Sequence, residues 1–517
     1  MLNKCYCATC IGVEAVVVTV EVDLSTGIGI HLVGLPDSAV RESLLRVVTA
    51  LTSYGFRIPG RKLVVNLAPA DIRKEGSAYD LAIALGMLAV SEQVRLADCE
   101  RFVIMGELAL DGRVRPVSGA LPVALQAKAE GFRGCIFPAE SAREAAEVED
   151  IAVYGVSSLA EAIEVLTLPE ARERLRVRPL PEDAGWQPSG NDFKHVKGQH
   201  EAKRGLEIAA AGGHNLILVG SPGSGKSLMA SCLPSILPAM TRDEAIETGK
   251  VYSVAGRGTR LSGLMRERPF RTPHHSASLV SLIGGGSHAL PGEISLAHHG
   301  VLYLDEMAQF PRSLLDALRQ PLEEGRVVIS RAKYKVEYPA SFMLVASMNP
   351  CPCGYYGDDS GRCTCSRGAV EGYLSRISGP MMDRIDLQIW TPGLSAAELL
   401  GRTSNGQPLP EEEPSAAIAA RVAAARDIQK ARFAGEGIYT NAAMNTRQLE
   451  RWCPLSETCR QTLEKILDRM GLSARAYTRI LKVARTIADL EGIPDIAPQH
   501  LLEAAGFRFL DRRRLFD

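Results

Sequence analysis

The chain has 517 residues, with 59 Lys and Arg against 60 Asp and Glu, so its formal net charge is −1. At about 150 residues per domain, this length predicts about three domains. A content of 46% hydrophobic and 23% charged residues is typical of globular proteins and argues against disorder and fibrous repeats. No apolar run reaches the roughly 18 residues that span a bilayer, and the amino terminus does not have the pattern of a signal peptide. We expect a cytoplasmic protein without a membrane partner.

Residues 1–175 alternate β-branched runs with helical patterns, as an α+β domain does. Val16–Val22 and Lys62–Leu67 are rich in β-branched residues and predict strands. Asp80–Val90 has the apolar spacing of a buried helix. Prolines and glycines recur in residues 176–192, which predicts a linker.

A glycine-rich loop follows directly after the apolar run Asn215–Val219, which predicts a strand. The loop fits the pattern G-x-x-x-x-G-K-[ST], in which backbone amides and the start of the next helix face phosphate oxygens. We expect Lys226 to reach the β- and γ-phosphates of ATP and Ser227 to bind Mg²⁺. The expected cofactor-binding residues of the loop are Gly220, Ser221, Pro222, Gly223, Ser224, Gly225, Lys226 and Ser227.

Two later apolar runs also end in polar residues. The run 300–306 ends in Asp305, which we expect to hold Mg²⁺, and Glu306, which we expect to deprotonate the attacking water. Because kinases with this loop usually lack the second carboxylate, ATP hydrolysis is the preferred reaction. The run 342–348 is followed by Asn349, an amide that is suited to holding the lytic water and sensing the γ-phosphate.

Clustered cysteines in a reducing compartment bind metal more often than they form disulfides. The spacing C-x-C-x9-C-x-C predicts one structural Zn²⁺ at four thiolates, with free or redox-labile thiols as the alternative. These ligands are Cys351, Cys353, Cys363 and Cys365. A second group, Cys5, Cys7 and Cys10, lacks an evident fourth ligand and receives no assignment.

Several long motifs in a fixed order resemble the magnesium-chelatase-like branch of the AAA+ ATPases, and within it the bacterial ComM (YifB) family. The resemblance implies an α/β phosphate-loop ATPase core at residues 193–393, a linker at 394–415 and a helical lid at 416–517. These motifs are Val196–Gln199, Ala202–Arg204, Arg268–His275, Pro291–His298, Asn349–Gly354 and Ser473–Tyr477.

The same resemblance implies a ring-forming motor, in expectation a hexamer, with ATP between subunits. The arginine that a neighbouring subunit supplies matches Arg384, with Arg376 as the alternative, and the sensor arginine of the lid matches Arg475. ComM-like proteins are associated with natural transformation and resemble branch-migration helicases. The implied partners are single-stranded and branched DNA and recombination proteins.

Residues 250–271 contain six Lys or Arg and one acid, which suits attraction to a DNA backbone. A solvated insert is the equal alternative for this stretch. Other reactions also stay open: a chelatase-type motor that remodels a protein partner for metal insertion, or an ATP-dependent protease.

The amino-terminal part resembles the Lon-protease-type fold. Active members pair a nucleophilic serine with a lysine, but the serine position falls on Ala78, beside Ser77, and no lysine occurs in residues 120–127. We therefore expect a proteolytically inactive domain that serves assembly or DNA contact. The resemblance rests on residues 66–71, 75–81 and 112–119.

Overall fold

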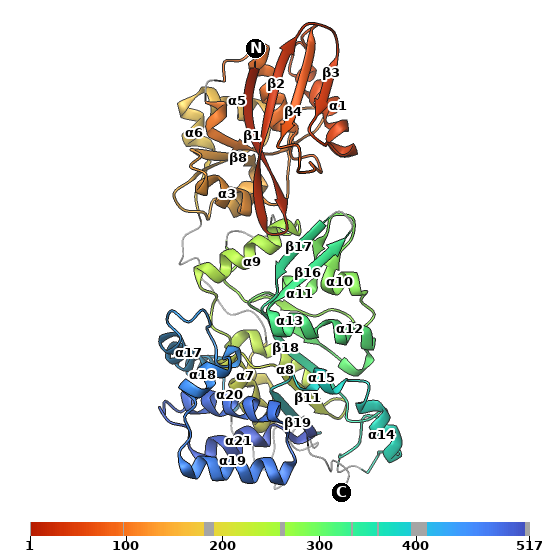
Figure 1. Cartoon of the computed structure of the whole chain (residues 1–517), viewed down its shortest axis with the longest axis vertical. Helices are drawn as coiled ribbons and strands as arrows, with labels where there is room; N and C mark the ends of the chain where they lie inside the picture. The colour runs from red at the N-terminus through yellow and green to blue at the C-terminus, as the bar shows by residue number, and fades with distance from the viewer. Residues whose placement is uncertain are drawn as a thin grey trace.

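The computed structural model describes residues 2–96, 98–179, 191–258, 264–331, 334–358, 361–393 and 411–511. Figure 1 shows an amino-terminal sheet with its helices at one end of the long axis, a central α/β part, and a helical part beside the lower half of the centre. Every helix among the described residues is too short or too polar to cross a membrane.

The amino-terminal part is built on a mixed sheet. Among the described residues, eight strands lie in the order β10-β9-β8-β5-β1-β2-β4-β3. Their bounds are β1 Leu2–Ile11, β2 Glu14–Ser25, β3 Ile30–Val33, β4 Lys62–Ala68, β5 Phe102–Ile104, β8 Gly134–Pro138, β9 Ala152–Val156 and β10 Arg176–Val177. The short strands β6 Glu107–Leu108 and β7 Val114–Arg115 pair separately.

Helices cover this sheet and form one apolar core with it. The strands predicted at residues 16–22 and 62–67 lie in β2 and β4, and the predicted buried helix coincides with α2. β10 pairs with β9, so residues 176 and 177 belong to the sheet rather than to a linker; residues 180–190 of that linker lie outside the described residues. The helices are α1 Ser38–Ser53, α2 Asp80–Val90, α3 Ala120–Ala129, α4 Ala139–Ala145, α5 Leu159–Thr167 and α6 Pro169–Leu175.

The central part contains a parallel sheet in the order β12-β15-β18-β11-β19 among the described residues. Because all these strands run the same way, their carboxyl ends meet at one edge, and Gly220 pairs there with Thr391. The predicted strands at 215–219, 300–306 and 342–348 correspond to β11, β15 and β18. The bounds are β11 Leu216–Gly220, β12 Phe270–Arg271, β15 Val301–Leu304, β18 Met343–Met348 and β19 Leu387–Thr391.

Helices and two hairpins surround this sheet. The hairpins are β13 Gly284–Gly285 with β14 Leu290–Pro291, and β16 Arg326–Arg331 with β17 Tyr334–Pro339. The helices are α7 His200–Gly212, α8 Lys226–Cys232, α9 Arg242–Val254, α10 Leu279–Ile283, α11 Glu293–Leu296, α12 Arg312–Ala317, α13 Arg319–Glu324, α14 Arg367–Leu374 and α15 Gly379–Met382.

The carboxyl-terminal part is helical and packs on α7 and the central sheet through a shared apolar core. Its polar anchor is His214, whose ring nitrogens lie 3.1 Å from Asp386 and 2.8 Å from Thr486. The predicted helices at 416–433 and 472–490 are α17 and α20; residues 394–410 and 512–517 lie outside the described residues. The helices are α17 Ser415–Arg432, α18 Thr446–Trp452, α19 Glu457–Met470, α20 Ala474–Leu490 and α21 Pro498–Gly506.

The amino-terminal part contacts the centre through α9 and the β16–β17 hairpin. The Gly119 amide donates to the Ser253 carbonyl at 3.2 Å, and the Ser253 hydroxyl donates to Glu144 at 2.7 Å. At Gly12, in the β1–β2 turn, an added Cβ would lie 2.7 Å from Val336 of β17. Burial raises the pKa of Glu144 to about 7.

Candidate nucleotide site and cysteine cluster

The phosphate loop joins the end of β11 to the start of α8. Gly223 and Gly225 have φ of +80° and +86°, a region that residues with a Cβ rarely adopt. Gly220 packs against the Thr391 backbone, where an added Cβ would overlap the carbonyl. The sequence therefore needs glycine at these positions to make the turn and to seat it on the sheet.

Lys226 and Asn349 meet at the carboxyl edge of the sheet. The Lys226 ammonium donates to the Gly220 carbonyl at 2.8 Å and the Ser221 carbonyl at 2.9 Å, and it lies 3.4 Å from Asn349 Oδ1. Burial lowers the pKa of Lys226, although Asp305 and Glu306 oppose this effect. The ammonium thus lies beside an amide and within the electrostatic influence of two acids.

Asp305 and Ser227 form a pair of oxygen ligands of the kind that Mg²⁺ prefers. The Ser227 hydroxyl donates to Asp305 Oδ2 at 3.1 Å, and Tyr303 and Ser347 donate to Oδ1 at 2.9 and 2.5 Å. Burial opposes ionisation of Asp305, but hydrogen bonds from these three hydroxyls outweigh it and lower its pKa. Asp305 is therefore a charged carboxylate at neutral pH, the form that binds divalent cations.

Glu306 is exposed and has a left-handed backbone, with φ of +51° and ψ of +51°. Such strain in a residue with a side chain recurs at functional sites. Its amide donates to Asp305 Oδ1 and to Ser347 Oγ, each at 3.1 Å. Sequence reasoning missed Ser347, which is 1% exposed; a lone hydroxyl within an otherwise apolar strand was the available signal.

Arg384 and Arg475 lie at the opposite edge of the same sheet. The Asn215 side chain, just before β11, donates to the Arg384 carbonyl at 3.0 Å. Because a strand rises about 3.3 Å per residue, the five residues of β11 separate this edge from the phosphate loop by about 16 Å. Arg475 reaches the same edge and binds Asp383 at 2.8 Å. The structure brings the two arginines together, but not to their own chain's phosphate loop.

The three candidate arginines differ in exposure. Arg384 is 7% exposed, pairs with Glu323 and donates to the Arg319 carbonyl at 3.2 Å. The alternative, Arg376, is exposed, and its guanidinium lies 5.6 Å from the centre of the Tyr373 ring. The Arg475 side chain is 65% exposed.

The four predicted zinc ligands converge on one point. Cys351 Sγ lies 3.3 Å from Cys353 Sγ and 3.9 Å from Cys363 Sγ. Cys353 Sγ and Cys363 Sγ lie 3.7 Å apart, and Cys365 Sγ lies within 4.8 Å of the other three sulfurs. Zn–S bonds of about 2.3 Å in a tetrahedron place sulfurs about 3.8 Å apart, so the four thiols fit one ion. Hydrogen bonds from the Tyr355 backbone and Cys351 lower the pKa of Cys353 to about 6, which favours the metal-binding thiolate.

The amino-terminal cysteines form no such cluster among the described residues. All three lie on β1, where Cys5 Sγ is 2.6 Å from Cys99 Sγ in the core. Burial raises the pKa of Cys7 and raises that of Cys10 to about 12. These thiols are packing residues of the sheet.

Glu247, His298 and His299 also gather within 4.8 Å. The Ser341 amide donates to His298 Nδ1 at 3.0 Å, so the proton of the neutral ring sits on Nε2, which faces Glu247 at 3.4 Å. A protonated nitrogen cannot bind a metal. This group is a hydrogen-bonded cluster that supports α9.

Four basic residues of 250–271 are paired with acids. Lys250 binds Glu14 of the amino-terminal part at 3.3 Å, Arg268 binds Glu244 at 3.0 Å, and Arg257 and Arg271 both reach Glu293. Residues 259–263 lie outside the described residues. These four cations thus stabilise contacts within the chain, which for them favours the structural alternative over a DNA-binding surface.

The surroundings of Ser77 differ from the site of a serine–lysine protease. The Ser77 hydroxyl donates to Glu107, and the Lys74 ammonium donates to the Pro69 carbonyl. Lys128 lies in a pair with Asp150 at 3.1 Å. No described lysine is positioned here to take a proton from Ser77. A cavity of about 460 Å³ separates Ser77 from the hairpins of the central part.

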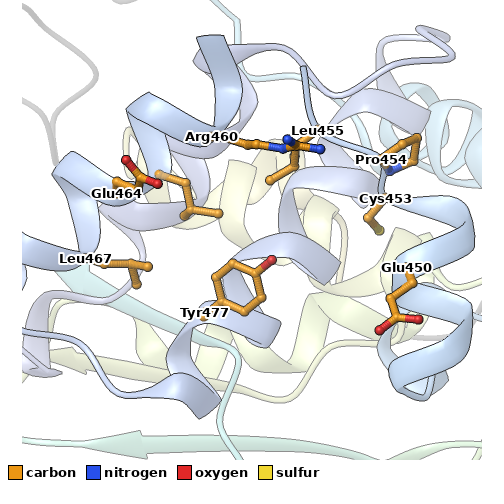
Figure 2. A pocket seen from close by; sticks show the side chains of 9 residues that line it. Glu450, Cys453, Pro454, Leu455, Arg460, Glu464, Leu467 and Tyr477 are labelled. Atoms are coloured by element: carbon orange, nitrogen blue, oxygen red, sulfur yellow. The ribbon is translucent and has the colours of Figure 1, made fainter. Parts of the chain in front are cut away.

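The helical part contains a separate cavity of about 350 Å³ between α18, α19 and α20. Figure 2 shows Tyr477 on one side and Glu450 on another, with Leu455 and Leu467 between helices. None of its lining residues belongs to the nucleotide site.

Comparison with known proteins covers nearly the whole chain. The family model for magnesium chelatase, subunit ChlI, matches residues 192–399, with related ChlI models at 20–141 and, for the carboxyl-terminal domain, 412–508. Competence protein ComM of Haemophilus influenzae is 44% identical over 515 residues, which cover 98% of this chain and 97% of that protein. YifB of Salmonella typhimurium is 42% identical over 503 residues, covering 97% and 96%. A magnesium-chelatase 38 kDa subunit of Chlorobaculum parvum is 27% identical over 184 residues, 31% of this chain and 53% of that subunit.

Identity at this level and coverage, together with the phosphate loop and acidic strand at one sheet edge, decides the family. The chain belongs to the ComM/YifB family of magnesium-chelatase-like AAA+ proteins.

Proposed function

We propose that this protein binds MgATP at the phosphate loop and hydrolyses it. The observation that carries the proposal is the convergence of four side chains and the Glu306 backbone at one sheet edge, where two of the side chains offer oxygens for Mg²⁺. AAA+ membership supports the same reaction. The five residues are Lys226, Ser227, Asp305, Glu306 and Asn349.

In this mechanism each residue has a separate task. Lys226 would hold the β- and γ-phosphates, and Ser227 and Asp305 would hold Mg²⁺, which would supply positive charge opposite the phosphates. Glu306 takes the proton of the attacking water, whose oxygen Asn349 orients. The hydrogen bonds from the Glu306 amide to Ser347 and Asp305 fix the backbone of the base next to the metal ligand.

The site is completed by a second copy of the chain. We base this on the about 16 Å between the phosphate loop and the edge that carries Arg384 and Arg475. A neighbour packed head to tail would present both arginines to the γ-phosphate, where Arg384 stabilises transferring charge. Arg384 would exchange its pair with Glu323 for the phosphate. We propose a closed ring, a hexamer, as the working assembly.

The proposed substrate of the motor is DNA. Support comes from full-length similarity to competence protein ComM. We propose that ATP turnover drives branch migration that integrates single-stranded DNA during recombination and transformation, with recombination proteins as partners. The amino-terminal part, proposed as an inactive Lon-like domain over residues 1–175, serves assembly or DNA contact.

A second candidate is a motor that remodels a protein partner. The match to magnesium chelatase models over all three parts favours it. Proteolysis is the weakest candidate because Ser77 bonds Glu107 rather than a lysine. We further propose that the cysteines at 351–365 hold a structural Zn²⁺ within an ATPase core at 193–393, with a lid at 416–517.

The deciding experiment is ATP hydrolysis by the purified protein, alone and with single-stranded, duplex or four-way-junction DNA at fixed salt. We expect DNA to stimulate turnover several-fold and Lys226→Ala to abolish it. Turnover that no DNA alters would favour the protein-remodelling candidate. Unchanged turnover in Lys226→Ala would overturn the site.

A further inference from the structure

The cysteine loop lies against the phosphate loop. Its first ligand, Cys351, is buried two residues after Asn349, and its described residues, 351–358 and 361–365, contain no helix or strand. At Gly354, with φ of +89°, an added Cβ would lie 2.7 Å from Pro222 in the middle of the phosphate loop. The Gly354 backbone therefore packs against the Pro222 ring with no room for a side chain.

One hydrogen bond joins the loops directly. The Ser221 hydroxyl donates to Asp358 Oδ2 at 2.9 Å. Ser221 is 2% exposed and the Asp358 side chain 12% exposed, so little water competes for this bond. Arg362, also in the cysteine loop, lies 3.8 Å from the same carboxylate oxygen and packs on Tyr355. The Asp358 carboxylate is thereby held between the phosphate loop and its own loop.

The described residues of the cysteine loop form no helix or strand that would hold it in shape. It is rich in glycine and charged residues, and three of its four cysteines are only half-buried. A short polar loop without a core depends on cross-links, and four thiolates around one ion supply them. Releasing the ion would free the segment between Cys353 and Cys363, which carries Asp358.

We infer that Asp358 is a positioning residue for nucleotide binding, and that metal bound by the four cysteines tightens ATP binding by holding Asp358 against Ser221. The inference rests on the proposal that ATP binds at the phosphate loop. It adds that the affinity of that loop for ATP depends on metal at a cluster that does not touch the nucleotide.

The test measures two quantities on the full chain: bound zinc per chain, by elemental analysis, and the Kd of a fluorescent ATP analogue. We expect Cys363→Ser to lose zinc and to bind the analogue about tenfold more weakly. Asp358→Ala should keep zinc and weaken binding about as much. Asp358→Asn keeps an acceptor oxygen for Ser221 and should bind within about twofold of wild type. Glu371→Gln, in an exposed pair with Arg367 on α14, is the matched control.

Removing zinc from the wild-type protein with a chelator tests the same inference without any mutation. Removing zinc should raise the Kd, and adding zinc back should restore it; circular dichroism checks that the fold persists. Should Cys363→Ser not fold, the two Asp358 variants decide. If Asp358→Ala and zinc-free protein bind the analogue like wild type while Lys226→Ala does not, this inference is overturned and the proposed function stands. If wild type binds no analogue, the proposed function itself fails.

Discussion

Ser347 connects the metal-binding acid to the proposed base. It donates to Asp305 and accepts from the Glu306 amide while almost fully buried. Without the Ser347 hydroxyl, the left-handed backbone of Glu306 loses the hydrogen bond that its amide donates to Ser347. Under the proposed mechanism, Ser347 is therefore a positioning residue for Asp305 and Glu306.

We expect Ser347→Ala to lower kcat about tenfold, the equivalent of one lost hydrogen bond of about 1.4 kcal/mol. The Kd for ATP should change less than kcat, because the Ser347 hydroxyl bonds Asp305 and the Glu306 amide rather than a residue of the phosphate loop. Steady-state ATPase assays with a separate binding titration measure both. The control is Ser375→Ala, which removes an exposed hydroxyl near α14. An equal loss in kcat and ATP affinity would contradict this role.

Among single residues, those that belong to sequence motifs could be predicted. The residues that hold them in place through hydrogen bonds could not. Lys226, Asp305 and Asn349 belong to patterns whose spacing along the chain carries their chemistry. Ser347 and Asp358 act through contacts between distant segments, and a serine or aspartate alone has no distinctive spacing. The pairing of Arg268 with Glu244 likewise leaves no pattern in the sequence, so the sequence could not decide between a DNA contact and a structural role for residues 250–271.

Among the elements, α4 and α9 meet at a buried acid. Glu144 of α4 accepts from Ser253 of α9, and burial raises its pKa from 4.5 to about 7. A raised pKa means that the folded protein binds this proton more tightly than the unfolded chain. Stability is therefore lost as pH rises from about 4.5 to about 7, by on the order of 3 kcal/mol.

We expect Glu144→Gln to remove this pH dependence. Between pH 5 and 8 the thermal midpoint of the wild-type protein should fall by several degrees more than that of the variant. Differential scanning fluorimetry across this range measures it, and Glu140→Gln, on the exposed side of α4, is the control. Parallel curves for wild type and Glu144→Gln would contradict the assignment.

Long periodic elements were the easiest to predict. α2 begins and ends where its apolar spacing does, because a fully buried helix shows its pattern without interruption. β10 was predicted as linker, since two residues carry no periodicity and pair only after the chain returns to β9. The docking of the β1–β2 turn on β17 likewise arises from packing between distant segments.

For the molecule as a whole, the opposed positions of the phosphate loop and Arg384 predict complementation between inactive variants. Arg384→Ala alone should bind ATP but hydrolyse it at least tenfold more slowly, and Glu306→Gln alone should be inactive. In a random one-to-one mixture about a quarter of the interfaces combine an intact base with an intact arginine.

The mixture should therefore recover a substantial fraction of wild-type turnover, measured after subunit exchange. Mixing Arg384→Ala with the double variant Glu306→Gln/Arg384→Ala is the control, because no interface there contains Arg384. Full activity of Arg384→Ala alone would contradict the assignment and move attention to Arg376.

The division into an amino-terminal part, a central part and a helical part follows from composition shifts and motif order. How these parts pack depends on single contacts, such as Lys250 with Glu14, that leave no pattern in the sequence. The family resemblance suggested Arg384 and Arg475 as candidates, but it did not say at which end of the strands they lie. The parallel order of β11 and β19 places them at the end opposite the phosphate loop.

The parallel order of β11 and β19 also predicts how ATPase activity depends on protein concentration. If one edge of the sheet supplies the loop and the other the arginines, a lone chain has two half-sites and no whole one. An open row of subunits always ends in one unfinished site, whereas a closed ring has none. Specific activity should then climb steeply with protein concentration and level off once rings close, even at saturating ATP.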